Sequence, residues 1–272
     1  MKKLFILLFW LGLSGAAQAV VQVKEVTYKG EQHGYGSPIY TMLKGYLAYD
    51  DAISGKRPGI LVVPEWWGNN EYAHRRARML AELGYTALAI DMYGDGKVTD
   101  QAEEAAKLAA EVNSNRDLEE TRFFAAYDLL SKQETVNPNQ IAAFGYCFGG
   151  TVALNMVRAG ANLEGVASFH GGLSSSIPIK PNRYHGHIVS FSGDADPLIG
   201  PDKIAAFKQE MEKAGIDYRI VTYPGAKHAF SNPDADALGK KFNLPIAYNA
   251  AADKDSWEQA TKFLREIFPA NK

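Results

Sequence analysis

Two hydrophobic patterns follow one another along this chain of 272 residues. Between residues 21 and 50, apolar and polar side chains alternate often enough to predict two antiparallel edge strands, joined through residues 34–38. From residue 59 onward, short uninterrupted apolar runs take over, as is typical of strands that are covered on both faces of a sheet. These runs predict strands at residues 59–63, 86–90, 140–144, 165–169, 187–191 and 218–223.

Stretches with helical periodicity separate the apolar runs. They predict helices at residues 71–83, 100–112, 118–133, 150–159, 201–214 and 247–268. Strands that alternate with helices in this way form a mostly parallel, doubly wound α/β sheet with helices on both faces. In such a sheet, the side chains that bind or react with a ligand lie just beyond the carboxyl ends of the strands.

The beginning of the chain has the composition of a targeting segment. Two lysines, an apolar stretch at residues 4–13 and small residues up to Ala19 predict a secretory signal that occupies residues 1–19. We therefore expect an exported protein, in the periplasm of a bacterium. Residues 20–272 show no repeat or linker, and the chain is 46% hydrophobic, which predicts one domain with an ordinary core.

Net charge and the motifs that the chain lacks limit the kinds of partner and cofactor that it can bind. The formal net charge is −2, and −4 without Lys2 and Lys3, with no long run of one sign, so nucleic acid and anionic membranes are disfavoured. We expect a small-molecule substrate and a monomer or homodimer. No His and acid residues fall at zinc spacing, and the Gly149-Gly150 pair lacks the lysine of a phosphate loop, so neither a metal nor another cofactor is expected.

The sole cysteine, Cys147, lies at the centre of Gly145-Tyr146-Cys147-Phe148-Gly149. This pentapeptide falls between a predicted strand and a predicted helix and has the pattern of a G-x-S-x-G nucleophile elbow, with sulfur in place of oxygen. The two glycines allow the sharp turn that exposes the nucleophile. A lone cysteine is otherwise usually a small buried hydrophobe, and here no disulfide can form within the chain.

A thiol with a pKa of about 8.5 is mostly protonated at neutral pH and needs a base. In this architecture an acid and then a histidine follow the nucleophile along the chain. Asp196, on the loop after the strand at 187–191, is the predicted acid, and Asp194 is the alternative, although turns contain such residues for other reasons. His228, after the strand at 218–223, is the predicted base, and His170 is expected to have a structural or pocket-lining role.

Two backbone amides are predicted to bind a developing oxyanion. One belongs to Phe148, directly after the nucleophile, and the other to Trp66, after the strand at 59–63. Glu65, beside two tryptophans at that strand end, is expected to be buried, which would raise its pKa and allow it to exchange a proton with Cys147. The alternative is a loop carboxylate in solvent.

Together these residues resemble the dienelactone hydrolase family of α/β hydrolases. The resemblance implies the α/β-hydrolase fold, a Cys147–His228–Asp196 triad, Glu65 as acceptor of the thiol proton, and no cofactor. It spans nearly the whole mature chain and rests on Pro64-Glu65-x-x-Gly68, Asp91-Met92-Tyr93, Gly145-Tyr146-Cys147-Phe148-Gly149-Gly150, Gly193-x-x-Asp196 and Gly225-x-x-His228-x-Phe230.

The chain departs from family members that cleave dienelactone. Those members carry one arginine shortly after the D-x-Y element and another four residues after the catalytic histidine, where this chain has Gly94-Asp95 and Asn232. We therefore predict an esterase-type hydrolase for small, neutral esters or lactones, not for dienelactone itself. Its pocket is predicted to be lined by Trp66, Trp67, Tyr93, Tyr146, Phe148, His170 and Phe230.

Other activities remain open on the same residues. A thiolate that faces an oxyanion hole also suits a thioesterase, or attack on an aryl phosphotriester. Two alternatives belong to other classes: a non-catalytic exported ligand-binding protein, and a thiol redox sensor, which is disfavoured because no second cysteine can resolve a sulfenic acid.

Overall fold

Two long strands begin the described part of the chain. The computed structural model describes residues 21–32 and 39–269. Strand β1 (Val21–Gln32) pairs antiparallel with β2 (Ile39–Asp50) along its full length. The predicted signal segment and residues 34–38 lie outside the described residues.

The strands form one eight-stranded sheet in the order β1-β2-β4-β3-β5-β6-β7-β8. Strand β2 runs antiparallel to β4, and all the pairs from β4 to β8 are parallel. The predicted fold class, a mostly parallel sheet with antiparallel edge strands at its N-terminal side, is therefore confirmed. The remaining strands are β3 (Arg57–Val63), β4 (Thr86–Ala89), β5 (Val136–Tyr146), β6 (Gly165–Phe169), β7 (His187–Gly193) and β8 (Asp217–Tyr223).

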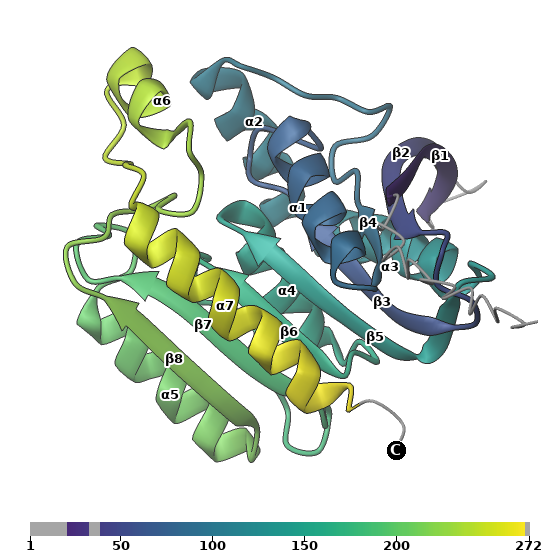
Figure 1. The fold of residues 1–272 in the computed structure, drawn as a ribbon. Helices are drawn as coiled ribbons and strands as arrows, with labels where there is room; N and C mark the ends of the chain where they lie inside the picture. Colours follow the sequence, from purple (N-terminus) through teal and green to yellow (C-terminus); the bar gives the residue numbers. More distant parts are fainter. Residues whose placement is uncertain (1–20, 33–38, 270–272) are drawn as a thin grey trace, which may run out of the picture.

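Helices cover both faces of this sheet, and each face has its own apolar cluster. In β3, Ile60 and Val62 pack with α1 and α7, whereas Leu61 and Val63 pack on the opposite face with α3 and α4. Figure 1 shows α7 lying across β6 and β7, with α4 on the other side of the sheet. The helices are α1 (Glu71–Glu82), α2 (Ala102–Ser114), α3 (Arg116–Ser131), α4 (Phe148–Ala159), α5 (Pro201–Ala214), α6 (Ala235–Phe242) and α7 (Ala250–Ile267).

Helix α6 is the element that the sequence pattern did not predict. It has eight residues, contains Gly239, and its N-cap Asp234 makes no capping hydrogen bond. A helix this short gains its stability from packing, and the ring of Phe242 lies 6.0 Å from that of Trp67 between centroids. It lies beyond the carboxyl ends of the strands (Figure 1). None of the helices in the described ranges has the length and apolar character to cross a bilayer.

Candidate active site

Cys147 occupies a sharp turn between β5 and α4. Its backbone has φ 52° and ψ −116°, a strained conformation for a residue with a side chain. A Cβ on Gly149 would lie 2.2 Å from the carbonyl oxygen of Val63, and a Cβ on Gly145 would lie 2.2 Å from that of Gly149. The turn therefore needs glycine at both positions, since the backbone of the elbow packs directly against the end of β3.

His228 and Asp196 meet Cys147 from two other loops. The Nε2 atom of His228 lies 3.0 Å from the Cys147 sulfur, and its Nδ1 lies 2.8 Å from Oδ2 of Asp196. Both His228 and Asp196 are buried. Asp194 is exposed, and it accepts a hydrogen bond from the backbone N–H of Gly225 instead. Of the two candidate acids, the structure brings Asp196 to the histidine.

The His228 ring lies between the sulfur of Cys147 and the carboxylate of Asp196. Burial alone would lower its pKa, but the sulfur of Cys147 and the carboxylate of Asp196 together raise the pKa of His228 well above its ordinary value. Asp196 also accepts the backbone N–H of Leu198 at 2.8 Å, which fixes its orientation. The geometry suits a positively charged imidazole that faces a thiolate.

The two predicted oxyanion donors belong to Trp66, which lines the same cavity as Cys147, and to Phe148, which directly follows Cys147 in the chain. Neither the N–H of Trp66 nor that of Phe148 has a hydrogen-bond partner among the described residues. The hydroxyl of Tyr93 donates to the carbonyl oxygen of Trp66 at 2.8 Å and so holds that loop. Phe148 is the first residue of α4, whose N-cap, Cys147, makes no side-chain cap bond. Two N–H groups are thus available to an anion beside the sulfur.

Glu65 is buried next to these groups. Its Oε2 accepts a hydrogen bond from Nδ2 of Asn232 at 2.6 Å, and its Oε1 has no partner among the described residues. Burial raises the pKa of Glu65 to about 7, although the Asn232 hydrogen bond and the nearby charge of His228 lower it in part. At neutral pH this carboxyl can therefore hold or release a proton.

A cavity of about 280 Å³ connects these residues, and most of its wall is apolar. Leu238, Leu244, Pro245 and Ile246, from α6 and the segment after it, form one side. Backbone contacts hold that segment, since the N–H of residue 247 donates to the carbonyl oxygen of His228 at 3.2 Å. The lining residues are Glu65, Trp66, Trp67, Cys147, Leu198, His228, Ala229, Asn232, Leu238, Leu244, Pro245 and Ile246.

A larger and more open hollow of about 580 Å³ lies elsewhere, between β1 and α3. Its lining includes Lys29, Glu31, Asp117 and Glu120, and none of the residues described above. We therefore assign the chemistry to the smaller cavity, which contains the reactive sulfur.

Five residues predicted to line the pocket do not border the cavity. They are all buried: Tyr93, Tyr146, Phe148, His170 and Phe230. Tyr146 belongs to the apolar cluster on the α1 and α7 face and stacks on the ring of Phe169 at 4.6 Å, because alternate strand side chains point to opposite faces. His170 was expected to have a structural or pocket-lining role, and its ring contacts the backbone of the nucleophile.

Several cavity residues were missed by the sequence analysis. Leu198, Leu238, Leu244, Pro245 and Ile246 carry no motif, and they reach the cavity only through tertiary packing. Asn232 had a weak signal in its spacing of four residues from His228. In the described ranges, no group of His, Cys, Asp and Glu side chains is arranged to hold a metal ion.

Comparisons with known proteins match most of this chain. Residues 43–268 match the model of the dienelactone hydrolase family. A Bradyrhizobium protein, named a probable 2-oxo-3-(5-oxofuran-2-ylidene)propanoate lactonase, is 28% identical over 81% of this chain and 88% of its own length. A dienelactone hydrolase-like promiscuous phosphotriesterase from metagenomic libraries is 31% identical, with a TM-score of 0.80 over 91% of this chain and 99% of its own. A structure named m3DLH is 34% identical, with a TM-score of 0.83 over the same shares.

Proposed function

Because this chain belongs to the dienelactone hydrolase family of α/β hydrolases, and is a hydrolase of esters or lactones, we propose that it cleaves small neutral carboxylic esters or lactones through an acyl-thiol intermediate on Cys147. One observation carries this proposal. The Cys147 sulfur lies 3.0 Å from His228, which Asp196 holds from behind, at the wall of an apolar cavity.

Acylation begins at the sulfur. The Cys147 thiolate attacks the carbonyl carbon, a C–S bond forms, and the π electron pair moves onto the carbonyl oxygen. The N–H groups of Trp66 and Phe148 bind the oxyanion. His228 then donates its proton to the leaving alkoxide while the C–O bond breaks, which leaves a neutral imidazole.

Deacylation reverses these roles. His228 takes a proton from a water molecule that attacks the thioester carbonyl, and the C–S bond breaks to release the acid and restore the thiolate. Asp196 stabilises the imidazolium at both stages. Glu65 provides a further proton acceptor at the same cavity when Cys147 is protonated.

The cavity wall favours a neutral substrate. Among the described lining residues none is lysine or arginine, and the single acidic one is Glu65. A substrate carboxylate would lose its hydration without gaining a lysine or arginine partner, since both ring nitrogens of His228 already contact Asp196 and Cys147. The apolar side formed by Leu238, Leu244 and Ile246 instead fits an alkyl or aryl group.

The first test is hydrolysis of a short-chain p-nitrophenyl ester. The protein without residues 1–19 is compared with Cys147→Ala and Cys147→Ser, and wild-type protein is titrated with iodoacetamide. Activity that disappears in Cys147→Ala and on stoichiometric alkylation supports the proposal. Equal activity in all three proteins contradicts it. Ligand binding without turnover would indicate a binding protein, and rapid oxidation of Cys147 without acyl transfer a redox sensor.

An aryl phosphotriester is a second candidate substrate. One observation favours it: the solved structure at 31% identity is named a promiscuous phosphotriesterase. The same thiolate and oxyanion donors would act on phosphorus instead of carbon. Turnover of an aryl diethyl phosphate that is lost in Cys147→Ala supports this activity. Activity retained by that variant argues against it.

We also propose that the protein is exported. The support is the pattern of residues 1–19, which lie outside the described part of the structure. N-terminal sequencing of the protein from a periplasmic fraction is expected to start at Val20. A start at Met1 in the cytoplasmic fraction would contradict export.

A further inference from the structure

His170 connects the nucleophile to a buried polar network. Its Nδ1 accepts a hydrogen bond of 3.1 Å from the backbone N–H of Cys147, which also donates to the carbonyl oxygen of Phe169 at 2.9 Å. Its Nε2 lies 2.8 Å from Oγ of Ser231. Because a backbone N–H can only donate, Nδ1 holds the lone pair, and the neutral ring carries its proton on Nε2. These contacts fix one neutral tautomer.

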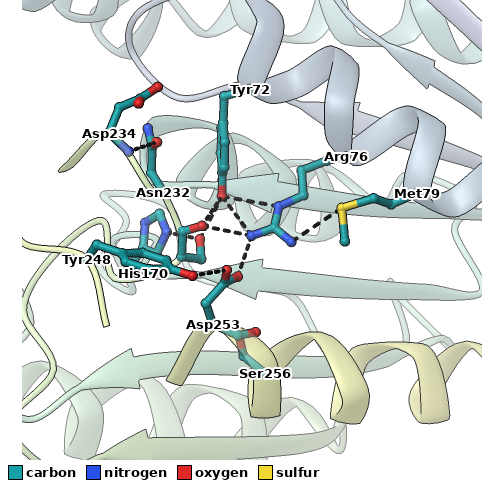
Figure 2. A network of polar contacts seen from close by, with 10 residues as sticks. Tyr72, Arg76, Met79, His170, Asn232, Asp234, Tyr248, Asp253 and Ser256 are labelled. Atoms are coloured by element: carbon teal, nitrogen blue, oxygen red, sulfur yellow. Dashed lines mark hydrogen bonds and ion pairs between the residues drawn. The ribbon is translucent and has the colours of Figure 1, made fainter. Parts of the chain in front are cut away.

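The network continues from Ser231 to two helices. Its Oγ lies 2.7 Å from the hydroxyl oxygen of Tyr72 on α1, and its carbonyl oxygen accepts from Nη2 of Arg76 at 2.8 Å. Arg76 is fully buried and pairs with Asp253 on α7. Figure 2 shows Arg76 between Tyr72 and Asp253, with His170 to the left of this cluster. Ser231 is therefore held directly by α1, and α7 contributes through the pairing of Asp253 with Arg76.

Backbone strain gathers around the His170 ring. Three non-glycine residues here have positive φ: Cys147 at 52°, His170 at 42° and Ala229 at 58°. Conformations of this kind cost about 1–3 kcal/mol each and persist only where surrounding contacts hold them. The His170 ring also packs edge-on to His228, with centroids 5.3 Å apart. The strained turn at Cys147 and the loop that carries His228 thus both pack against the His170 ring.

We propose that His170 is a positioning residue that sets the Cys147 sulfur and the His228 loop relative to each other. Its Nδ1 holds the elbow backbone, and its Nε2 holds Ser231, three residues beyond the base. The ring is fully buried and does not border the cavity, so it acts through Cys147 and His228 and not on the substrate.

The ring can fill this role only while it is neutral. A proton on Nδ1 would point at the N–H of Cys147 and break that hydrogen bond. Burial, together with the positive charges of His228 and Arg76, holds the pKa of His170 well below its ordinary range. The other titratable or charged groups around the ring are Tyr72 on α1, Tyr146 on β5 and Asp253 on α7.

The test compares variants that remove one or both hydrogen bonds. His170→Leu removes both, His170→Asn keeps an acceptor near the position of Nδ1, and Ser231→Ala removes the far partner. Ser190→Ala is the control, because Ser190 is buried on β7 and its hydroxyl has no partner among the described residues. Thermal unfolding establishes that each variant is folded.

Two measurements are made on each folded variant. The first is kcat and KM for p-nitrophenyl butyrate. The second is the pH profile of Cys147 alkylation by iodoacetamide, which requires the thiolate but not hydrolysis. This inference rests on the proposed function, and the second measurement separates the two: if the wild-type protein hydrolyses no ester, the proposed function fails while the alkylation profile still tests His170.

We expect His170→Leu to lower kcat about 10- to 100-fold with little change in KM, as small displacements of reacting groups do. Its alkylation profile should move to higher pH, because the sulfur loses its close contact with the His228 ring. Ser231→Ala should move both values in the same direction, and His170→Asn should recover part of the loss.

Unchanged kcat, within about twofold, and an unchanged midpoint in folded His170→Leu would overturn the proposal. Should His170→Leu fail to fold, an unchanged midpoint in Ser231→Ala would overturn it equally. A change of the same size in Ser190→Ala would show that any buried polar deletion has this effect, which also contradicts a specific role for His170.

Discussion

The side-chain amide of Asn232 donates a 2.6 Å hydrogen bond to the buried carboxyl of Glu65. Asn232 lies four residues after His228, where family members that cleave dienelactone are expected to have an arginine. A neutral amide stabilises a carboxylate much less than a cation does, so burial dominates and raises the pKa of Glu65 to about 7. With asparagine at this position, Glu65 has a raised pKa and the cavity wall lacks a guanidinium group there.

Glu65→Gln is expected to change how stability depends on pH. The carboxyl binds more protons in the folded protein than in the unfolded chain between pH 4.5 and about 7. Its contribution to stability is thus full below pH 4.5 and is lost as the pH rises through 7. Glutamine does not titrate. Between pH 5 and pH 8, the free energy of unfolding of the wild type should therefore fall relative to that of the variant, by up to about 3 kcal/mol. Urea unfolding at both pH values measures this, and a constant difference would exclude a raised pKa.

Asn232→Arg is expected to change substrate preference. An arginine at this position would place a cation beside Glu65 at the cavity wall and offer a partner to a substrate carboxylate. The ratio of kcat/KM for a carboxylate-bearing ester to that for a neutral ester should rise about tenfold or more. Asn232→Gln keeps the cavity neutral and serves as the control, and an equal ratio in both variants would contradict the electrostatic explanation.

Asp196→Asn and Asp194→Asn form a matched pair of substitutions. Asp196 contacts the His228 ring, so its amide variant should no longer hold the imidazole in the correct tautomer. We expect kcat to fall about 10³- to 10⁴-fold. Asp194 is exposed and contacts only the loop at Gly225, so its variant should remain within a few-fold of wild type. Steady-state hydrolysis decides between them, and the reverse result would move the acid to Asp194.

Gly149→Ala is expected to prevent the elbow from forming. The added methyl group would meet the carbonyl oxygens of Val63 and Pro64 at 2.2 and 2.5 Å, and these are backbone atoms that cannot rotate away. We expect a loss of more than about 3 kcal/mol in stability, and little soluble protein. Gly55→Ala is the control, because it has positive φ but open space, and should cost only about 1–2 kcal/mol. Similar unfolding midpoints for both would show that the elbow relaxes more readily than the structure implies.

Much of this site was predictable because its chemistry lies on strand ends. The apolar runs located the strands, and the loops after β3, β5, β7 and β8 then supplied Glu65, Cys147, Asp196 and His228. Because the base follows the acid along the chain in this architecture, His228 was predicted as the base in preference to His170. The choice between Asp194 and Asp196 needed coordinates, because both follow the same strand and differ only in which one reaches the imidazole.

The cavity wall was not predictable in the same way. Tyr146 was expected to line the pocket, but strand alternation directs it into the core on the face covered by α1 and α7. Leu238 and Leu244 reach the cavity because α6 folds back over it, and that packing is a long-range event without a local pattern. Motifs thus indicated the reacting groups, whereas the shape of the cavity depends on residues that carry no motif.

The apolar wall above Cys147 also bears on how the proposed reaction ends. An ester enters this cavity uncharged, but the acid that hydrolysis produces ionises at neutral pH. Its carboxylate then lies near Leu238, Leu244 and the acidic Glu65, with no lysine or arginine among the described lining residues and with the His228 ring already paired with Cys147 and Asp196. Because a carboxylate without a partner is far more stable in water than in an apolar site, the product leaves readily and does not return. Ionisation of the product thus gives turnover its direction, and ester synthesis by the same groups would require an acidic medium.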